Sequence, residues 1–264
     1  MTWTPVQQRH AIERVRFEVA FTESLPARVV DSAKRTFEQV RNDVRFEEPT
    51  HQEYHQFLVG RDAALSRAGK GTDGWLARRK LASGLIAEAV TLNSTTFSYE
   101  TTDYRDWGTA YRRFEKIAAK IIEQIATVVD FRSVAHDYVD RFVFQGFPKD
   151  AKPTDIFVPA LLAPLNEGAR SGRFLWHIHH GWFEDVDGRS ILVNQNFDAQ
   201  DGQTPTGTDV RSLQILTKAE FRPKPDQFSV VDLEVIVKQL HDICNERFSS
   251  VLTDDAKKMI GLEV

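Results

Sequence analysis

Alternating side chains over residues 11–21 form the clearest pattern in the chain. One face of this segment is mostly apolar and the other mostly charged, as in a strand whose sheet is covered on one side and partly wet on the other. The apolar positions are Val15, Phe17, Val19 and Phe21, and the positions between them are Arg14, Arg16, Glu18 and Ala20. We therefore expect a strand here.

Three long stretches repeat apolar residues at steps of three and four, which predicts amphipathic helices. They cover residues 26–40, 107–129 and 233–248. At 1.5 Å per residue the second would be about 35 Å long, enough to cross a full sheet. The residues expected to cap the first two helices and a short C-terminal one are Ser24, Asp106 and Thr253.

Shorter apolar or alternating runs predict further strands. The residues are 85–92, 95–102, 134–144, 174–183, 191–197 and 213–221. Asn93-Ser94 and Asp187-Gly188 fall between neighbouring strands and are typical of hairpin turns, because Asn, Asp and Gly tolerate the required backbone angles. These pairs indicate antiparallel neighbours.

Residues 42–80 carry the weakest pattern. We expect a helical piece over 51–66, followed by a mobile loop that contains GKGTDG at residues 69–74. The glycines and lysine lack the G-x-x-x-x-G-K-[ST] spacing that lets backbone amides cradle a phosphate. Turn chemistry is therefore the better interpretation of this segment.

The order of elements favours an α+β fold with antiparallel sheets covered on one face by long amphipathic helices. The predicted organisation is a single α+β domain over residues 1–264. Within it, residues 1–146 and 173–264 are loosely similar halves, joined by a proline-rich crossover at 147–172. No sequence repeat supports a duplication.

Composition excludes several classes of protein. The chain has 264 residues, a formal net charge of −4 and one cysteine, Cys244. This charge provides no global basic field for nucleic acid. A lone cysteine forms no internal disulfide, and no apolar run is long enough for a signal peptide or a membrane helix. We expect a cytoplasmic protein that binds no membrane.

Four segments resemble a sporadically distributed family of uncharacterised bacterial and archaeal proteins of about 250 residues. They are IERVRFEVAF (12–21), DYRDWGTAYRRFEK (103–116), HDYVDRFVF (136–144) and LHDICNERFSSVLTDDAKKMIG (240–261). The resemblance covers nearly the whole chain. It implies one α+β unit and no assigned reaction.

The segment RFLWHIHHGWFE, residues 173–184, holds the best candidate for chemistry. In a strand, His177 and His179 would stand side by side on the face opposite Trp176. Two imidazoles at this spacing can supply half of a zinc or iron site, with His136 or Asp140 of a neighbouring strand as a further ligand. H-x-H alone is a weak signal, so histidines that line a sheet face are the simpler interpretation. We predict no cofactor.

Other polar residues have structural interpretations. Asp137 and Arg141 lie on one face of the 134–144 strand, too far apart for direct contact, so each should pair across strands. Cys244 lies on an apolar helical stripe and is expected to be a buried thiol. His241, near the same stripe, is expected to be partly buried and bonded to a sheet carbonyl.

Two short basic runs, Arg78-Arg79-Lys80 and Arg112-Arg113, lie beside aromatic residues. Single-stranded nucleic-acid grooves combine these residue types. Because the runs are short and the chain is acidic overall, we interpret both as solvated helix faces.

No motif identifies a reaction. The first hypothesis is a non-enzymatic protein-interaction module, which would use a sheet face, the loop over 60–80 and the crossover, and which the family's sporadic occurrence links to mobile or defence-type gene clusters. A sheet edge that pairs with its twin would make a homodimer. The alternative is a metal-dependent or small-ligand enzyme that uses His177 and His179 with His136 or Asp140.

Overall fold

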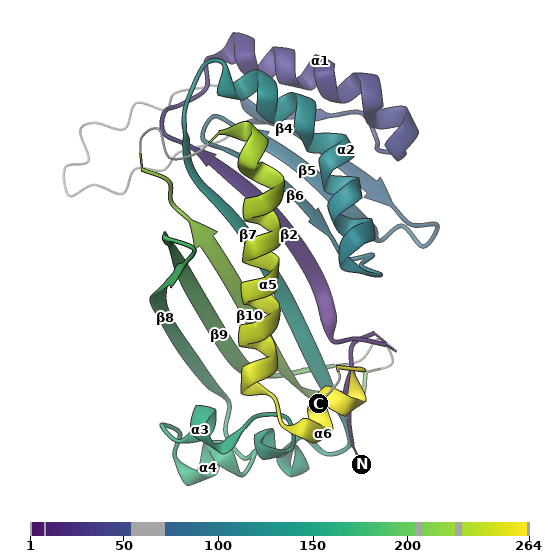
Figure 1. Cartoon of the computed structure of the whole chain (residues 1–264). Helices are drawn as coiled ribbons and strands as arrows, with labels where there is room; N and C mark the ends of the chain where they lie inside the picture. The colour runs from purple at the N-terminus through teal and green to yellow at the C-terminus, as the bar shows by residue number, and fades with distance from the viewer. Residues whose placement is uncertain (1, 8, 54–71, 204–206, 225–228, 263–264) are drawn as a thin grey trace, which may run out of the picture. The chain divides into compact units, whose positions relative to one another are not determined.

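A computed structural model describes residues 2–7, 9–53, 72–203, 207–224 and 229–262 (Figure 1). The chain divides into two compact units. Unit 1 contains residues 1–16, 134–224 and 231–264, and unit 2 contains 17–133 and 225–230. These boundaries differ from those of the two expected halves, and the crossover at 147–172 lies inside unit 1. The single-domain organisation stays a prediction.

Mixed helices and antiparallel strands confirm the α+β class. In unit 2 the strands follow the order β3-β4-β5-β6-β2. Their bounds are β3 Thr50–Glu53, β4 Thr72–Lys80, β5 Ile86–Asn93, β6 Thr96–Thr101 and β2 Ile12–Phe21. The hairpin turn expected at Asn93 is present, but its side chain makes it: Asn93 Oδ1 accepts hydrogen bonds from the backbone N–H groups of Thr95 and Thr96 at 2.8 and 2.7 Å.

Two helices pack on the strands of unit 2, α1 (Ala27–Val44) and α2 (Trp107–Ala126). The Asp106 cap is confirmed, because its Oδ1 accepts a hydrogen bond from the Thr109 N–H at 2.8 Å. The Ser24 cap is wrong: α1 begins after Pro26, whose fixed φ suits a helix start and whose carbonyl receives the Val29 N–H at 2.8 Å. Stacked rings of Phe17 and Phe114, with centroids 4.6 Å apart, are part of the core.

Two predictions between residues 42 and 80 are wrong where the structure describes the chain. Residues 51–53 belong to strand β3, although a helix was expected, and β4 begins inside GKGTDG at Thr72. Gly74 marks a close approach of strands, because a Cβ there would lie 2.1 Å from the carbonyl oxygen of Leu92. Residues 54–71, which hold most of the predicted helix and much of the predicted loop, lie outside the described residues.

The strands of unit 1 follow the order β2-β7-β10-β9-β8, and β1 also pairs with β7. Their bounds are β1 Thr2–Pro5, β7 Phe131–Gln145, β8 Trp176–Val186, β9 Arg189–Gln203 and β10 Asp209–Phe221. The Asp187-Gly188 hairpin is confirmed. Both residues have positive φ, 53° and 73°, as a two-residue turn of the primed type requires.

The long C-terminal helix α5 (Leu233–Val251) packs on the strands of unit 1 (Figure 1). Buried Cys244 contacts the carbonyl oxygens of His136 and Thr217 from this helix, at 3.5 and 3.7 Å, so its structural interpretation is confirmed. A short helix α6 (Asp254–Met259) follows, and Thr253 caps it by accepting the Ala256 N–H.

The crossover contributes to the core of unit 1. It contains the 3-10 turns η1 (Pro148–Asp150) and η2 (Pro153–Asp155) and the short helices α3 (Pro159–Leu162) and α4 (Glu167–Arg170). Pro159 disfavours helical angles at Val158, which is extended with ψ 147°, so η2 and α3 do not join into one helix. Within the described part of the chain, no helix is long and apolar enough to cross a membrane.

Candidate functional site

His177 and His179 lie on strand β8, exposed, and each faces a polar residue of β9. The Nδ1 atom of His177 is 2.6 Å from Asp198 Oδ1, and the Nδ1 atom of His179 contacts Asn196 Oδ1. These are directly opposite cross-strand pairs in the ladder. Trp176 is buried, so the tryptophan side of β8 is the core side, as its alternation predicts.

His136 and Asp140 lie on the opposite face of the sheet from this pair. Cross-strand register aligns His136 with Ala219, then Val193, then Trp182. Asp140 is aligned in the same way with Ile215, Phe197 and Ile178. Residues opposite each other across strands share a face, so both belong with the even-numbered side chains of β8.

The structure therefore does not bring His177 and His179 together with His136 or Asp140. Their separation follows from strand alternation, because a neighbouring strand places only every second residue on a given face. Among the described residues, no group of three or more His, Cys, Asp and Glu side chains is arranged to hold a metal ion. A binding role for His177 and His179 alone stays a prediction.

Two histidines lie instead at the packing surface between β7 and α5. Burial lowers the pKa of His136 to about 3, with a further contribution from His241, and burial also lowers the pKa of His241 to about 4. His241 is partly buried, as expected, and its Nδ1 lies 2.8 Å from the hydroxyl of Tyr138 on β7, whereas the expected bond to a sheet carbonyl stays a prediction. Both imidazoles are neutral near pH 7.

Asp137 and Arg141 pair across strands, as predicted. Asp137 accepts hydrogen bonds from Arg16 Nε at 2.7 Å and Arg14 Nη2 at 3.4 Å. Arg141 donates from Nε to Glu13 Oε2 at 3.0 Å. The charged partners come from β2, and Arg141 also donates to Ser212 and Gln214 of β10, so these groups tie three neighbouring strands together.

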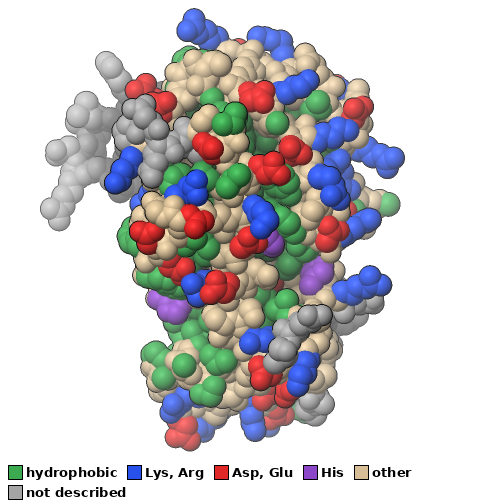
Figure 2. Space-filling model, viewed as in Figure 1, with side chains coloured by type: hydrophobic (Ala, Val, Ile, Leu, Met, Phe, Trp, Pro, Cys, Tyr) green, Lys and Arg blue, Asp and Glu red, His purple; other side chains and the backbone are tan. Residues whose placement is uncertain are grey.

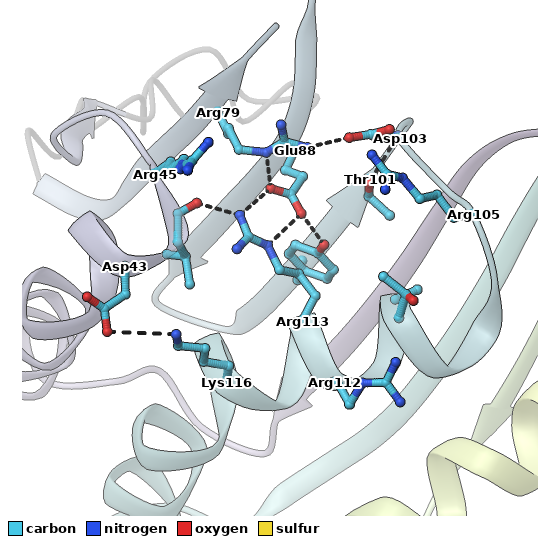
Figure 3. Close-up of a pocket in the computed structure, with 14 residues that line it drawn as sticks. Asp43, Arg45, Arg79, Glu88, Thr101, Asp103, Arg105, Arg112, Arg113 and Lys116 are labelled. Atoms are coloured by element: carbon cyan, nitrogen blue, oxygen red, sulfur yellow. Dashed lines mark hydrogen bonds and ion pairs between the residues drawn. The ribbon is translucent and has the colours of Figure 1, made fainter.

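Unit 2 contains a cavity of about 460 Å³ that brings many charged side chains together (Figure 3). We name it the arginine pocket. Its basic side chains are Arg45, Arg79, Arg105, Arg112, Arg113 and Lys116, and its acidic ones are Asp43, Glu88 and Asp103. Lys and Arg side chains also gather on the upper right of Figure 2, over α1 and α2.

Glu88 of β5 is the centre of the pocket floor, with a side chain only 4% exposed. Arg113 of α2 donates to it from Nε at 2.9 Å and from Nη2 at 2.7 Å. Arg79, directly opposite on β4, donates from Nε, and the Tyr99 hydroxyl of β6 donates at 2.6 Å. Arg113 also donates to the Val44 carbonyl at the end of α1. One carboxylate therefore joins three strands and two helices.

Electrostatics keep this carboxylate charged. Burial favours the neutral form of Glu88, but hydrogen bonds from Arg113, Tyr99 and Arg79 outweigh it and lower the pKa below its usual value. Burial and the neighbouring Glu88 charge raise the pKa of Tyr99, so the phenol stays protonated and donates. The two inner guanidinium groups are thus held in fixed orientations.

Positive charge remains in excess after this pairing. Six basic side chains line the pocket against three acidic ones, a net formal charge of +3. Asp106, beside the pocket, is close enough to Arg112 and Arg105 for their charges to contribute to lowering its pKa, after the hydrogen bonds from Thr109. No ion pair within the described part of the chain involves Arg45 or Arg105. These two arginines lie on either side of the Glu88 network in Figure 3.

The sequence contained part of this site. The runs that hold Arg79 and Arg113 were interpreted as solvated helix faces, and for Arg79 this is wrong because it lies on a strand with its side chain 20% exposed. Opposite charges at directly facing positions of β4 and β5 are the signal that would have revealed Glu88. Because β4 was not predicted, its pairing with β5 was invisible.

Comparisons with known proteins give no family. No protein-family model matches the chain, and a search of curated proteins finds no significant match. The resemblance carried by four segments of the sequence therefore stays an expectation.

Proposed function

We propose that this protein is a binding protein whose unit 2 holds a small anionic molecule in the arginine pocket. The observation that carries the proposal is the excess of cationic side chains in one cavity of about 460 Å³. This volume lies within the range of about 300–1,000 Å³ that is typical of small-molecule sites. Clustered arginines favour phosphate or carboxylate groups, which their planar forks bind through paired hydrogen bonds.

The inner and outer arginines have different roles in this proposal. Arg79 and Arg113 are held in place by hydrogen bonds to Glu88, Asp103 and Val44, so they supply a fixed positive field. Arg45 and Arg105 are exposed and have donors available for a ligand. A ligand between these two would neutralise charge that the protein itself leaves unbalanced.

The backbone of Arg45 supports the proposal independently. Arg45 ends α1 in the left-handed conformation, with φ 58° and ψ 41°. Glycine is the usual residue at such a helix end, because it adopts this conformation without a steric penalty. A strained arginine at the rim of a basic pocket indicates that its side chain is needed there, since strained residues cluster at ligand sites.

Calorimetric titration of the full chain with pyrophosphate, citrate and ADP tests the proposal. We expect at least one of them to bind with a salt-sensitive affinity, because exposed charges are screened by ions. Arg105→Ala should weaken that binding by about tenfold, as expected for the loss of one charge-assisted hydrogen bond. Arg28→Ala provides a matched control, since Arg28 is an exposed arginine of α1 outside the pocket.

Absence of binding for all three anions would contradict the proposal. So would binding that Arg105→Ala and Arg28→Ala weaken equally, because the anion would then be attracted by general surface charge. If ADP binds but pyrophosphate does not, the protein recognises the nucleoside. That result would also contradict the proposal that arginines supply the affinity.

This function is compatible with the non-enzymatic interaction module expected from the sequence, which remains a proposal. In that module, long helices would cover one face of the sheets, and the opposite face would be left for a partner. The metal-enzyme alternative has less support, because the faces of the sheet separate His177 and His179 from both expected further ligands.

A further inference from the structure

Strand β8 is an open edge in unit 1. It is the last strand in the described order, and its 11 residues pair with β9 in continuous register, without a bulge. Natural edge strands are commonly protected by lysine, proline, bulges or short length, because an open edge pairs readily with another strand. Residues 176–186 contain neither lysine nor proline, and Phe183 is 65% exposed.

The sequence of β8 is complementary to itself in antiparallel orientation. Gly181 is the midpoint of Trp176–Val186, so a twofold axis at Gly181 pairs every residue of one strand with a residue of the other. His177 then faces Asp185 of the second copy, and His179 faces Phe183. A shift of the register by two residues would leave two residues of each strand unpaired.

The side-chain chemistry agrees with this register. Asp198 already engages Nδ1 of His177, which leaves Nε2 as the ring atom that can bond to an acid of a second copy. Opposite charges and aromatic contacts at directly facing positions stabilise antiparallel pairs. In the same register, the imidazole of His179 from the second copy covers the exposed side chain of Phe183, so apolar surface is also buried from water.

We propose that two copies of this chain associate through antiparallel pairing of their β8 strands, with Gly181 at the twofold axis. His177 and His179 are then interface residues, and the HIHH segment serves assembly. The proposal is independent of the arginine pocket, which lies in unit 2.

Sedimentation of the full chain over a range of concentrations tests the association. We expect a dimer, and we expect His179→Lys combined with Phe183→Lys to raise its dissociation constant by at least about tenfold, because lysines then face each other across the axis. Phe147→Lys is the matched control, since Phe147 is 64% exposed but lies outside β8. A wild-type monomer at all concentrations, or equal effects of both variants, would overturn the proposal.

Cysteine cross-linking tests the register. A mixture of His179→Cys and Phe183→Cys proteins should form a disulfide-linked heterodimer under mild oxidation, because facing residues bring their Cα atoms within disulfide range. The native Cys244 is buried and does not compete. A mixture of His179→Cys and Asp185→Cys, which face each other only in the register shifted by two residues, should not cross-link. Preferential linkage of this second mixture would overturn the axis at Gly181.

Discussion

Two buried carboxyl groups, one in each unit, behave in opposite ways. Glu88 in unit 2 is 4% exposed and Asp140 in unit 1 is 1% exposed. Glu88 accepts hydrogen bonds from two arginines and a tyrosine, and its pKa is lowered. Asp140 Oδ1 has no hydrogen-bond partner among the described residues, and burial raises the pKa of Asp140 well above its usual value. Because both groups are buried, it is the hydrogen-bond partners that decide the direction in which each pKa shifts.

The two groups therefore give opposite dependences of stability on pH. Glu88 has a lowered folded-state pKa, so its contribution is present above its unfolded value of 4.5 and is lost as pH falls through the folded value. Asp140 has a raised folded-state pKa. Its contribution is complete below its unfolded value of 3.8 and is lost as pH rises through the folded value. The Glu88 network thus favours the charged form of its acid, whereas burial shifts Asp140 towards its neutral form.

Replacing the paired acid should have the largest effect. Glu88→Gln leaves Arg79 and Arg113 partly buried without a counter-charge, and breaking such a network by removing one partner costs about 3–5 kcal/mol. Urea unfolding at pH 7 should measure this loss. Hydrogen exchange should show reduced protection in β4, β5 and α2, the elements that Glu88 joins.

Glu115→Gln is the matched control, because Glu115 is an exposed glutamate of the same helix as Arg113. It should change the free energy of unfolding by less than about 0.5 kcal/mol. Equal losses for the two variants would show that the Glu88 network contributes no more than a surface charge, and the contrast with Asp140 would then fail.

Replacing the unpaired acid should have a smaller effect of opposite sign. Asp140→Asn cannot ionise, so near pH 7 we expect it to be more stable than the wild type. The advantage should disappear below pH 3.8, where Asp140 is protonated in both the folded and the unfolded states. Unfolding by urea over a pH series measures the difference, and a constant difference at all pH values would contradict a raised pKa.

Sequence patterns predicted the skeleton of both units better than their sites. Alternation identified β2 and placed Trp176 on the buried side of β8, and helical periodicity identified α1, α2 and α5. Cross-strand pairing of Asp137 and Arg141 was also predictable, because a charge on a buried strand needs a partner. The Glu88 network was not, since β4 begins among glycines that are typical of a turn.

The metal hypothesis has a related limit, because the sequence does not fix how distant strands are aligned. Grouping His177 and His179 with His136 and Asp140 required knowledge of which face of β7 meets which face of β8. Two intervening strands, β10 and β9, set that relation through their registers. A shift of one residue in any of these ladders would have reversed the faces, and local sequence alone does not fix such a register.

Arg45 offers the smallest but most specific test of the contrast between the units. Arg45→Gly removes both the side chain and the penalty of its left-handed backbone, so the free energy of unfolding should rise by about 1 kcal/mol. If unit 2 holds spare positive charge for a ligand, the same variant should weaken binding of the anion found by titration. Urea unfolding and calorimetry on one protein sample measure both quantities.

A variant that is more stable and binds the anion as well as the wild type would mean that Arg45 is not used by the ligand. A rise in stability coupled to a loss of affinity is the outcome that a strained ligand-binding arginine requires, because the strain then persists only for the sake of binding.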